Sequence, residues 1–246
     1  MENSVRVLST LALAGAVRAL AAKYLALSGA RIDADFAPTV RLLERLKEGE
    51  TADVLILTRE GLAGLVAAGS VVTESCVDLA RSYIGLAVKA GSPHPDISTE
   101  AALRSTLLAA HSVAYSRLGA SGIFFAQLIA KKGIDKEINA RATVVPMGFT
   151  AERLVSGEAD LAIQQLSELK QVNGIEIVGP LPLHLQIPAV FSAGRLEAST
   201  NVVASDLLLK FLASAEATPA LIESGLERLT YARGGLQEQT GFWRNW

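Results

Sequence analysis

The sequence predicts an α/β fold built on parallel strands, and three observations lead to this prediction. Apolar segments with strand spacing and with helix spacing alternate along most of the chain. Val54 to Leu57 are four consecutive apolar residues without polar alternation, which is typical of a strand covered on both faces. A Gly-Glu connection followed by an Asp precedes an apolar strand twice, in residues 49–56 and 157–163. This repeat is either a common helix-to-strand turn or the sign of two similarly built lobes.

The elements are expected in alternating order. In the first part of the chain the expected strands are 5–8, 32–36, 54–57 and 83–88, and the expected helices are 13–24, 40–46 and a short one ending near Gly69. Gly91 to Pro95 form the clearest breaker cluster and are expected to be a crossover between lobes. In the second part the expected strands are 112–115, 143–145 and 161–163, and the expected helices are 124–132, 150–156, 205–213 and 219–228.

Composition excludes several classes of protein. The 246 residues carry 23 basic and 25 acidic side chains, a balance that argues against a nucleic-acid-binding protein. The single cysteine, Cys76, excludes an internal disulfide, a cysteine-based zinc site and a redox pair. The apolar run Val7 to Leu20 is too short to span a bilayer, so no membrane insertion is expected. As written the chain is expected to be cytoplasmic, or periplasmic if a leader peptide has been removed.

Familiar catalytic motifs are missing from the sequence. It contains no phosphate-binding loop, no dinucleotide fingerprint and no His-Glu-x-x-His, so neither a cofactor nor a metal is expected. Gly119 to Gly122 is one residue short of a nucleophile elbow. The three histidines, His94, His111 and His184, have no ligand spacing, and structural or surface roles are expected for them. The tail from Arg233 to Trp246, which holds both tryptophans, is expected to pack on the core or to be a loose end.

Hydroxyl side chains stand at the predicted strand-to-helix junctions. They are Ser9, Thr10, Thr39, Thr58, Ser116, Ser121 and Thr150. In an open parallel sheet, ligands bind at the carboxyl ends of strands, where helix N-termini present free N–H groups. Each hydroxyl alone is explained as a helix N-cap, but together they indicate a site for a small oxyanion or carboxylate. Arg117 follows Ser116 and supplies a fork that matches a carboxylate, and Arg59 is a weaker candidate for the same role.

Three stretches carry a resemblance to a known family. Val7 to Tyr24, Ala52 to Gly69, and Ser121 to Asp160 are similar, in order and spacing, to the type II periplasmic binding proteins, within them to the molybdate-binding-protein-like group. The resemblance implies two Rossmann-like lobes with mixed, mostly parallel sheets joined by a double crossover. Lobe one would be residues 1–85 with 187–246, and lobe two residues 86–186, with a ligand cleft between them.

The resemblance also implies a function. Ser9, Thr10, Thr39, Ser121 and Thr150 would face the cleft, and Gly122 would belong to the same ligand-binding turn. Arg117 and Pro38-Thr39 depart from the family pattern and favour an organic di- or tricarboxylate over molybdate. The expected function is therefore binding of a small anion for an ABC-type importer, with a permease as the partner, by a monomer or weak homo-oligomer.

Two alternatives stay open. Some members of the group resemble aconitate isomerases, which move a double bond by a proton shift and need an acid/base group near the reacting carbon. Tyr115, Glu168 and His184 are the candidates for that group. The other alternative is the ligand-sensing domain of a regulator, which ranks last because the chain begins with a strand rather than a helix-turn-helix.

Overall fold

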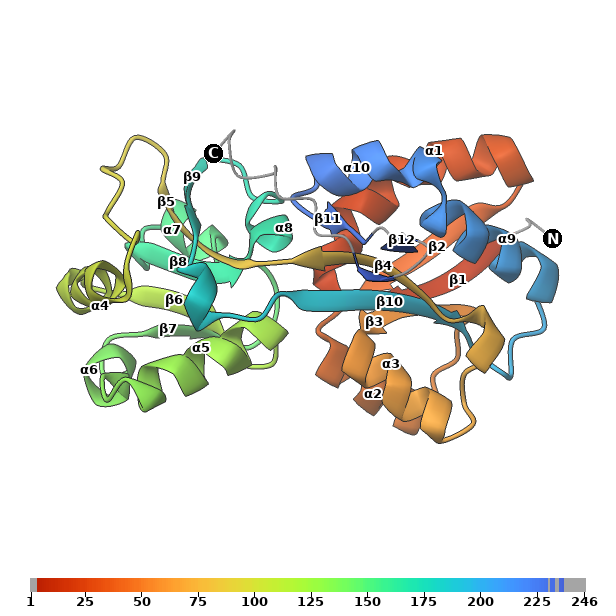
Figure 1. The fold of residues 1–246 in the computed structure, drawn as a ribbon, viewed down its shortest axis with the longest axis horizontal. Coiled ribbons are helices and arrows are strands. Elements are labelled where there is room, and N and C mark those ends of the chain that lie inside the picture. Colours follow the sequence, from red (N-terminus) through yellow and green to blue (C-terminus); the bar gives the residue numbers. More distant parts are fainter. Residues whose placement is uncertain (1–3, 230, 233–234, 237–246) are drawn as a thin grey trace. The chain divides into compact units, whose positions relative to one another are not determined.

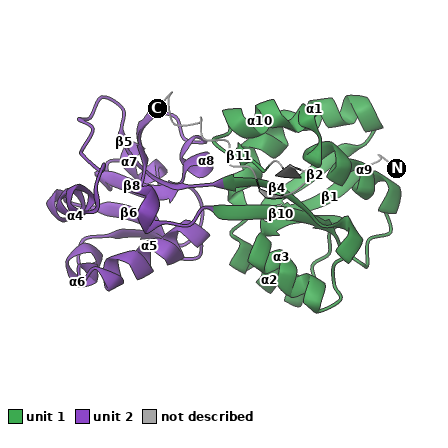
Figure 2. Ribbon diagram, in the orientation of Figure 1, with its two compact units in different colours: residues 1–81, 189–240 green, residues 82–188, 241–246 purple. Residues whose placement is uncertain are grey.

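The computed structural model describes residues 4–229, 231–232 and 235–236, and these form two compact units (Figure 2). Unit 1 contains the described residues up to Arg81 and from Ala189 onward, and unit 2 contains Ser82–Pro188. The chain therefore passes from one unit to the other twice, as a double crossover. The resemblance to the binding-protein family predicts these passages at 85/86 and 186/187. Ile84 belongs to unit 2 because its strand pairs there and its N–H donates to Gln186 Oε1 at 2.7 Å.

The expected crossover at Gly91 to Pro95 is wrong, because this segment lies inside unit 2. It is a turn that follows β5 (Ile84–Lys89) and is tied to β9 (Ile175–Pro180). The Gly91 N–H donates to Glu176 Oε1 at 2.9 Å, and His94 Nε2 lies 2.9 Å from Glu176 Oε2. The glycines and prolines therefore shape a local return rather than a passage between units.

Unit 1 is a sheet covered by helices on both faces (Figure 1). Its strand order is β11-β4-β10-β3-β1-β2, with β1 (Ser4–Ser9), β2 (Arg31–Phe36), β3 (Val54–Thr58), β4 (Val77–Ser82), β10 (Ala189–Arg195) and β11 (Glu227–Arg228). β1 is parallel to β2 and β3, and β10 is antiparallel to β3. Its helices are α1 (Ala14–Ser28), α2 (Thr39–Lys47), α3 (Arg59–Ala67), α9 (Val202–Ala213) and α10 (Thr218–Glu223), with the 3-10 turns η1 (Leu11–Leu13), η2 (Thr73–Ser75) and η4 (Ala215–Ala217).

The residues of β3 explain why both faces are covered. Val54 and Ile56 pack into the core beneath α1 and α9, whereas Leu55 and Leu57 pack against α2 and α3. Successive side chains of a strand point to opposite faces, so an unbroken apolar run needs an apolar layer on each side. The structure thus confirms the expectation drawn from this run.

One helix of the described residues, Leu11–Ser28, is long and apolar enough to cross a membrane by length and composition. In the structure it follows β1 directly and is a core element of unit 1. Val17, Leu20 and Tyr24 are buried, and the Tyr24 hydroxyl donates to the Ala204 carbonyl at 2.8 Å. Its charged Arg18 lies on the exposed face, as in an amphipathic surface helix.

Unit 2 repeats this plan. Its strand order is β7-β6-β8-β5-β9, with β6 (Val113–Ser116), β7 (Thr143–Val145) and β8 (Leu161–Gln165). β6 is parallel to β7 and β8, and β5 is antiparallel to β8, which matches the pairing of β1 with β2 and β3 and of β10 with β3. Its helices are α4 (Glu100–Ala109), α5 (Ala120–Lys131), α6 (Asp135–Asn139), α7 (Glu152–Val155) and α8 (Leu166–Leu169), with the turn η3 (Leu183–Leu185).

The internal repeat in the sequence has the same structure in both units. Gly49 and Gly157 end α2 and α7 with φ of 97° and 79°, a left-handed conformation that favours glycine. The aspartate that follows accepts a backbone N–H from the neighbouring segment: Asp53 from Arg6 at 2.9 Å, and Asp160 from His111 at 2.7 Å. The repeat therefore reflects two similarly built α/β lobes.

Several parts of the chain differ from the expectation or fall outside it. The strands β4 and β10 of the unit 1 sheet and β9 of the unit 2 sheet were not predicted, nor were the helices α4, α6 and α8. The predicted helix at 219–228 ends at Glu223 and is followed by the short strand β11. The tail, Arg233 to Trp246, lies outside the described residues except for Gly235–Leu236, which pairs as β13 with β12 (Tyr231–Ala232).

Candidate functional site

The carboxyl ends of the parallel strands gather the predicted hydroxyl residues in each unit. In unit 2, β6 ends at Ser116 and leads through a short turn into α5, while β8 on its flank ends at Gln165 and leads directly into α8. The pairing of Tyr115 with Ile163 places Ser116 level with the end of β8. The α5 and α8 N-termini therefore start at the same edge of one sheet, which we call the unit 2 edge.

Two serine hydroxyls at the unit 2 edge have no hydrogen-bond partner. Ser116 is 2% exposed and Ser121 is 0% exposed, and the Oγ atom of each is unsatisfied. A Cβ placed on Gly119 would lie 2.5 Å from Ser116 Oγ and 3.9 Å from Ser121 Oγ, so both hydroxyls lie close to this glycine, and Ser116 Oγ packs directly against it. Buried polar groups in folded proteins almost always have a partner, so these two hydroxyls are candidates for binding a polar ligand.

Gly122 brings α5 close enough to β6 to form this arrangement. A Cβ on Gly122 would lie 1.7 Å from the Ser116 carbonyl oxygen and 2.6 Å from Ser116 Oγ. Only glycine permits so close an approach of helix and strand. Gly122 is thus explained by the geometry of the turn, which also fixes the position of the two hydroxyls.

Arg117 supplies a positive charge at the same edge. Its N–H donates to the Val145 carbonyl at 2.8 Å, which anchors the backbone to β7, and its side chain is exposed. Among the described residues, the guanidinium forms no ion pair or hydrogen bond. Its charge acts on the neighbouring Tyr115, where burial raises the pKa of the phenol and Arg117 partly offsets that rise. An arginine without a carboxylate partner can bind one supplied by a ligand.

The β8–α8 junction adds a third unpartnered hydroxyl and a buried acid. Ser167 is 1% exposed and its Oγ has no partner. Glu168 is 6% exposed, and its Oε2 accepts the Gln165 N–H at 3.3 Å. Burial raises the pKa of the Glu168 carboxyl from 4.5 to about 7, although the Gln165 N–H and the Gln164 amide favour the charged form. The unit 2 edge thus combines three neutral donors, one cation and one carboxyl that changes charge near neutral pH.

Thr150 has a different role in the described structure. It follows β7 and is fully buried, and its hydroxyl lies 3.0 Å from Gln164 Oε1 and 3.3 Å from the Ile163 carbonyl. Its N–H donates to Gln164 Oε1 at 2.7 Å, and Gln164 Nε2 donates to Gly148 at 2.9 Å. Thr150 and Gln164 therefore tie the β7 loop to the end of β8, next to Glu168.

Unit 1 has a similar edge, but more of its hydroxyl groups form hydrogen bonds within the protein. Ser9 ends β1, and its hydroxyl donates to the Thr10 carbonyl at 3.0 Å. Thr10 precedes η1 without capping it, and its hydroxyl has no hydrogen bond among the described residues. The Thr39 hydroxyl accepts the Thr58 N–H at 3.1 Å, and Thr58 caps α3 by accepting the Gly61 N–H at 3.3 Å. Among these hydroxyls, that of Thr10 forms no hydrogen bond with the described residues, whereas those of Thr39 and Thr58 act as acceptors.

Arg59, the second arginine that the sequence suggested for ligand binding, already forms an ion pair within the protein. Its guanidinium binds both carboxylate oxygens of Asp78 on β4, and the Ser192 hydroxyl donates to the same carboxylate. These contacts tie the start of α3 to the adjoining strands of the unit 1 sheet. Arg59 therefore has a structural explanation, in contrast to Arg117.

The contrast between Thr10 and Thr58 gives a testable pair of substitutions. We expect Thr58→Val to lower the free energy of unfolding by about 1 kcal/mol, because it removes the N-cap of α3, and to leave ligand affinity unchanged. Thr10→Val removes a hydroxyl that caps nothing, so we expect it to change stability little and to weaken binding. Urea unfolding and titration with a panel of carboxylates and oxyanions measure both effects. Equal stability losses in the two variants would contradict the assignment.

The other two acid/base candidates lie away from the unit 2 edge. The Tyr115 hydroxyl donates to Asn139 Oδ1 on α6 at 2.6 Å, and its ring packs on Phe125 in the core. His184 is exposed, 4.0 Å from Glu100, and Glu100 also pairs with Lys132 at the C-terminal end of α5. The start of α5, not its end, carries Ser121. Of the three candidates, only Glu168 lies at this edge.

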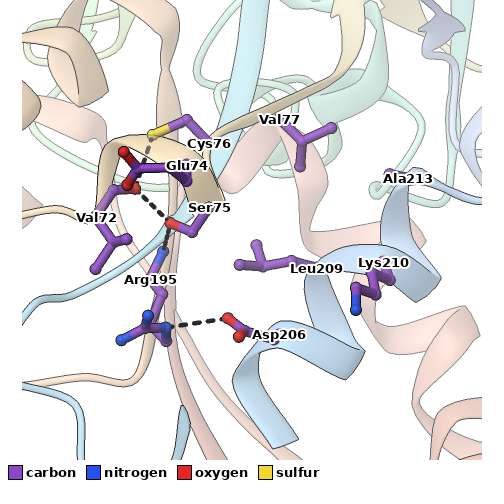
Figure 3. A pocket seen from close by; sticks show the side chains of 10 residues that line it. All are labelled: Val72, Glu74, Ser75, Cys76, Val77, Arg195, Asp206, Leu209, Lys210 and Ala213. Atoms are coloured by element: carbon purple, nitrogen blue, oxygen red, sulfur yellow. Dashed lines mark hydrogen bonds and ion pairs between the residues drawn. The ribbon is translucent and has the colours of Figure 1, made fainter. Parts of the chain in front are cut away.

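Unit 1 also has a separate pocket of about 330 Å³ beneath η2 and α9 (Figure 3). Three of its polar residues are paired with one another: Arg195 Nε donates to Asp206 at 3.0 Å, and the Arg195 N–H donates to Ser75 Oγ at 2.9 Å. Cys76 is a free, exposed cysteine at its rim, and burial, Asp78 and Glu74 raise the pKa of its thiol. The pocket has no orphaned buried donor, so the unit 2 edge is the stronger candidate. Among the described residues, no group of three or more His, Cys, Asp or Glu side chains could hold a metal ion.

Gln164 and Ser167 are not among the residues that the sequence predicts for the site. The expected strand ends at Ile163, whereas β8 continues to Gln165 and leads directly into α8. The sequence does carry a signal for these residues. A cluster of polar residues directly after a buried strand marks the carboxyl end of that strand, as Ser116 does after β6.

The chain is similar to known proteins along most of its length. The profile of the family described as "Bacterial extracellular solute-binding protein" matches residues 5–227. An aconitate isomerase from Pseudomonas sp. is 37% identical over 231 residues, which is 92% of this chain and 88% of that protein.

Solved structures share the fold at low sequence identity. The periplasmic molybdate-binding protein of Azotobacter vinelandii has a TM-score of 0.76 at 16% identity, covering 90% of this chain and 98% of that one. A sulfate-binding protein of Mycobacterium tuberculosis has a TM-score of 0.70 at 17% identity, covering 91% and 86%. These similarities confirm the type II binding-protein fold expected from the sequence.

Proposed function

Because the chain belongs to the family of bacterial extracellular solute-binding proteins, we propose that it binds a small polycarboxylate and interconverts the cis and trans isomers of a tricarboxylate such as aconitate. The observation that carries the proposal is the unit 2 edge, where Ser116, Ser121 and Ser167 lack partners beside Arg117 and Glu168. Hydroxyl donors with one arginine fork suit a carboxylate, which accepts several hydrogen bonds and pairs bidentately with a guanidinium.

The choice of a carboxylate over an oxometalate rests on charge. Neutral donors are sufficient for an oxyanion such as molybdate or sulfate, whereas the Arg117 guanidinium adds a positive charge and a planar fork that matches the two oxygen atoms of a carboxylate. The identity of 37% with an aconitate isomerase along nearly the whole chain supports the same choice and the isomerase reaction.

The proposal is tested by incubating the protein with trans-aconitate and following the vinyl proton signals of both isomers by NMR. We expect the cis isomer to form, and we expect Arg117→Ala to weaken binding roughly 10- to 100-fold, because hydrogen bonds to charged groups contribute about 1.5–3 kcal/mol. Arg104→Ala is the matched control, because Arg104 is an exposed arginine on α4. It removes the same charge from unit 2 and is expected to change neither binding nor conversion.

A receptor for an importer is the second candidate, and the family description favours it. Tight binding of trans-aconitate without conversion would support a receptor and exclude the isomerase. Absence of binding to any polycarboxylate, or equal effects of the two arginine substitutions, would overturn the proposal as a whole.

A further inference from the structure

Resting on the proposed function, we infer that Glu168 is the acid/base group that carries the proton in the isomerisation. Glu168 lies in the single turn of α8 that begins where β8 ends, and β8 is the parallel neighbour of β6, which ends at Ser116. Neighbouring strands are about 4.8 Å apart, so the Ser116 and α8 segments are within reach of one small ligand.

The surroundings of Glu168 match this role. It is 6% exposed, follows the unpartnered Ser167, and accepts the Gln165 N–H at 3.3 Å through Oε2. Gln164, which Thr150 and Gly148 hold from the β7 loop, orients the same junction. A proton-transfer group needs a fixed position and protection from water, and this carboxyl has both.

No other described side chain at the unit 2 edge can take the role. Arginine side chains do not accept protons in proteins, and serine hydroxyls are too weakly acidic to act unaided. The Tyr115 phenol is bound to Asn139 in the core, and His184 pairs with Glu100 away from this edge. Glu152 of α7 is exposed to solvent rather than enclosed.

The reaction is a proton shift that balances without a co-reactant. The ionised Glu168 removes a proton from the methylene carbon, and the electron pair of that C–H bond forms a new C=C bond to the central carbon. The old C=C pair moves to the far carbon, through a dienolate whose charge rests on the substrate carboxylates. The protonated Glu168 then returns the proton to the far carbon. The double bond has moved by one position, and Glu168 is ionised again.

The titration behaviour of Glu168 supports this cycle, because a pKa of about 7 leaves both forms populated at neutral pH. The strands packed against α8 are β5, β8 and β9. Their charged side chains are Lys89, which lies at the far end of β5 beside Ile175, and Glu176, which bonds to His94 and Gly91. Tyr83, whose carbonyl accepts the Leu166 N–H, is the titratable residue before β5. Burial is the main cause of the shift.

The test compares wild type with Glu168→Gln in D2O, using trans-aconitate and NMR detection. Glutamine keeps the acceptor for the Gln165 N–H but cannot take a proton. We expect Glu168→Gln to bind trans-aconitate within about threefold of wild type and to lose at least about 100-fold in conversion and in deuterium incorporation at the methylene. The rise of wild-type kcat/KM with pH through about 7 should disappear from any residual activity.

Glu152→Gln, the same substitution on the exposed surface of unit 2, is the matched control and should convert as wild type does. Conversion by Glu168→Gln at wild-type rate would overturn this inference while leaving the proposed function in place. Failure of wild type itself to convert would instead overturn the proposed function.

Discussion

Gly122→Ala is expected to destabilise unit 2 by about 3 kcal/mol and to abolish ligand binding. The new Cβ would lie 1.7 Å from the Ser116 carbonyl oxygen and 2.6 Å from the Ser116 carbonyl carbon. Because these are backbone atoms of β6, no side-chain rotation relieves the clash, and α5 must move away from the strand. That movement separates Ser121 from Ser116 and dismantles the unit 2 edge.

Two further glycine substitutions complete this test. In Gly119→Ala the new Cβ would lie 2.5 Å from the Ser116 hydroxyl oxygen. This side-chain atom can rotate away, so we expect a smaller loss of stability than for Gly122→Ala, together with a clear loss of affinity. Gly64→Ala on the exposed face of α3 meets no atom within 4 Å. It should stabilise the protein by about 0.5–1 kcal/mol, since alanine favours the helix. Urea unfolding and calorimetric titration give both quantities. A Gly122→Ala protein with wild-type stability and affinity would refute the described turn.

We expect the stability of Glu168→Gln relative to wild type to be greater at pH 8 than at pH 5. Folding raises the pKa of this carboxyl from 4.5 to about 7, so the folded state holds the proton more tightly than the unfolded chain does. The wild-type protein therefore loses stability as the pH rises from 4.5 through about 7, and below 4.5 the carboxyl imposes no such cost. At pH 8 the raised pKa lowers the free energy of unfolding of the wild-type protein by about 3 kcal/mol.

Glutamine cannot ionise, so the variant does not lose stability in this way as the pH rises. We expect its Tm, relative to wild type, to be roughly 6–12 °C higher at pH 8 than at pH 5. Differential scanning calorimetry at the two pH values measures this shift. Glu152→Gln on the surface of α7 should give the same Tm difference from wild type at both pH values. A Glu168→Gln difference that is independent of pH would show that the folded state does not raise the pKa of this carboxyl.

The sequence predicted the parallel core of both units because its signals are local. The apolar run of β3 and the helical spacing from Leu13 to Tyr24 each lie within one element, and both were found in the structure. β4 and β10 were missed because their evidence is not local. β10 follows the proline-rich return at 179–188 and pairs with β3, more than 130 residues earlier in the chain.

The sequence predicted where in the fold the candidate site lies, but not which of its hydroxyl groups lack a partner. Hydroxyl residues after strands were expected at the carboxyl edges, and the structure places Ser9, Ser116 and Thr58 at strand ends. Whether a hydroxyl is free depends on partners from other elements, which the sequence does not reveal. Thr150 is engaged by Gln164 from β8, whereas Ser121 is left without a partner.

The crystal structure of the protein with bound trans-aconitate is the most direct test of the role assigned to the unit 2 edge. We expect ligand carboxylate oxygens within about 3.2 Å of the Ser116 and Ser121 hydroxyls, with the Arg117 guanidinium paired to the same carboxylate. A ligand bound elsewhere, for example in the pocket beside Cys76, with both serine hydroxyls still unpartnered, would contradict the account.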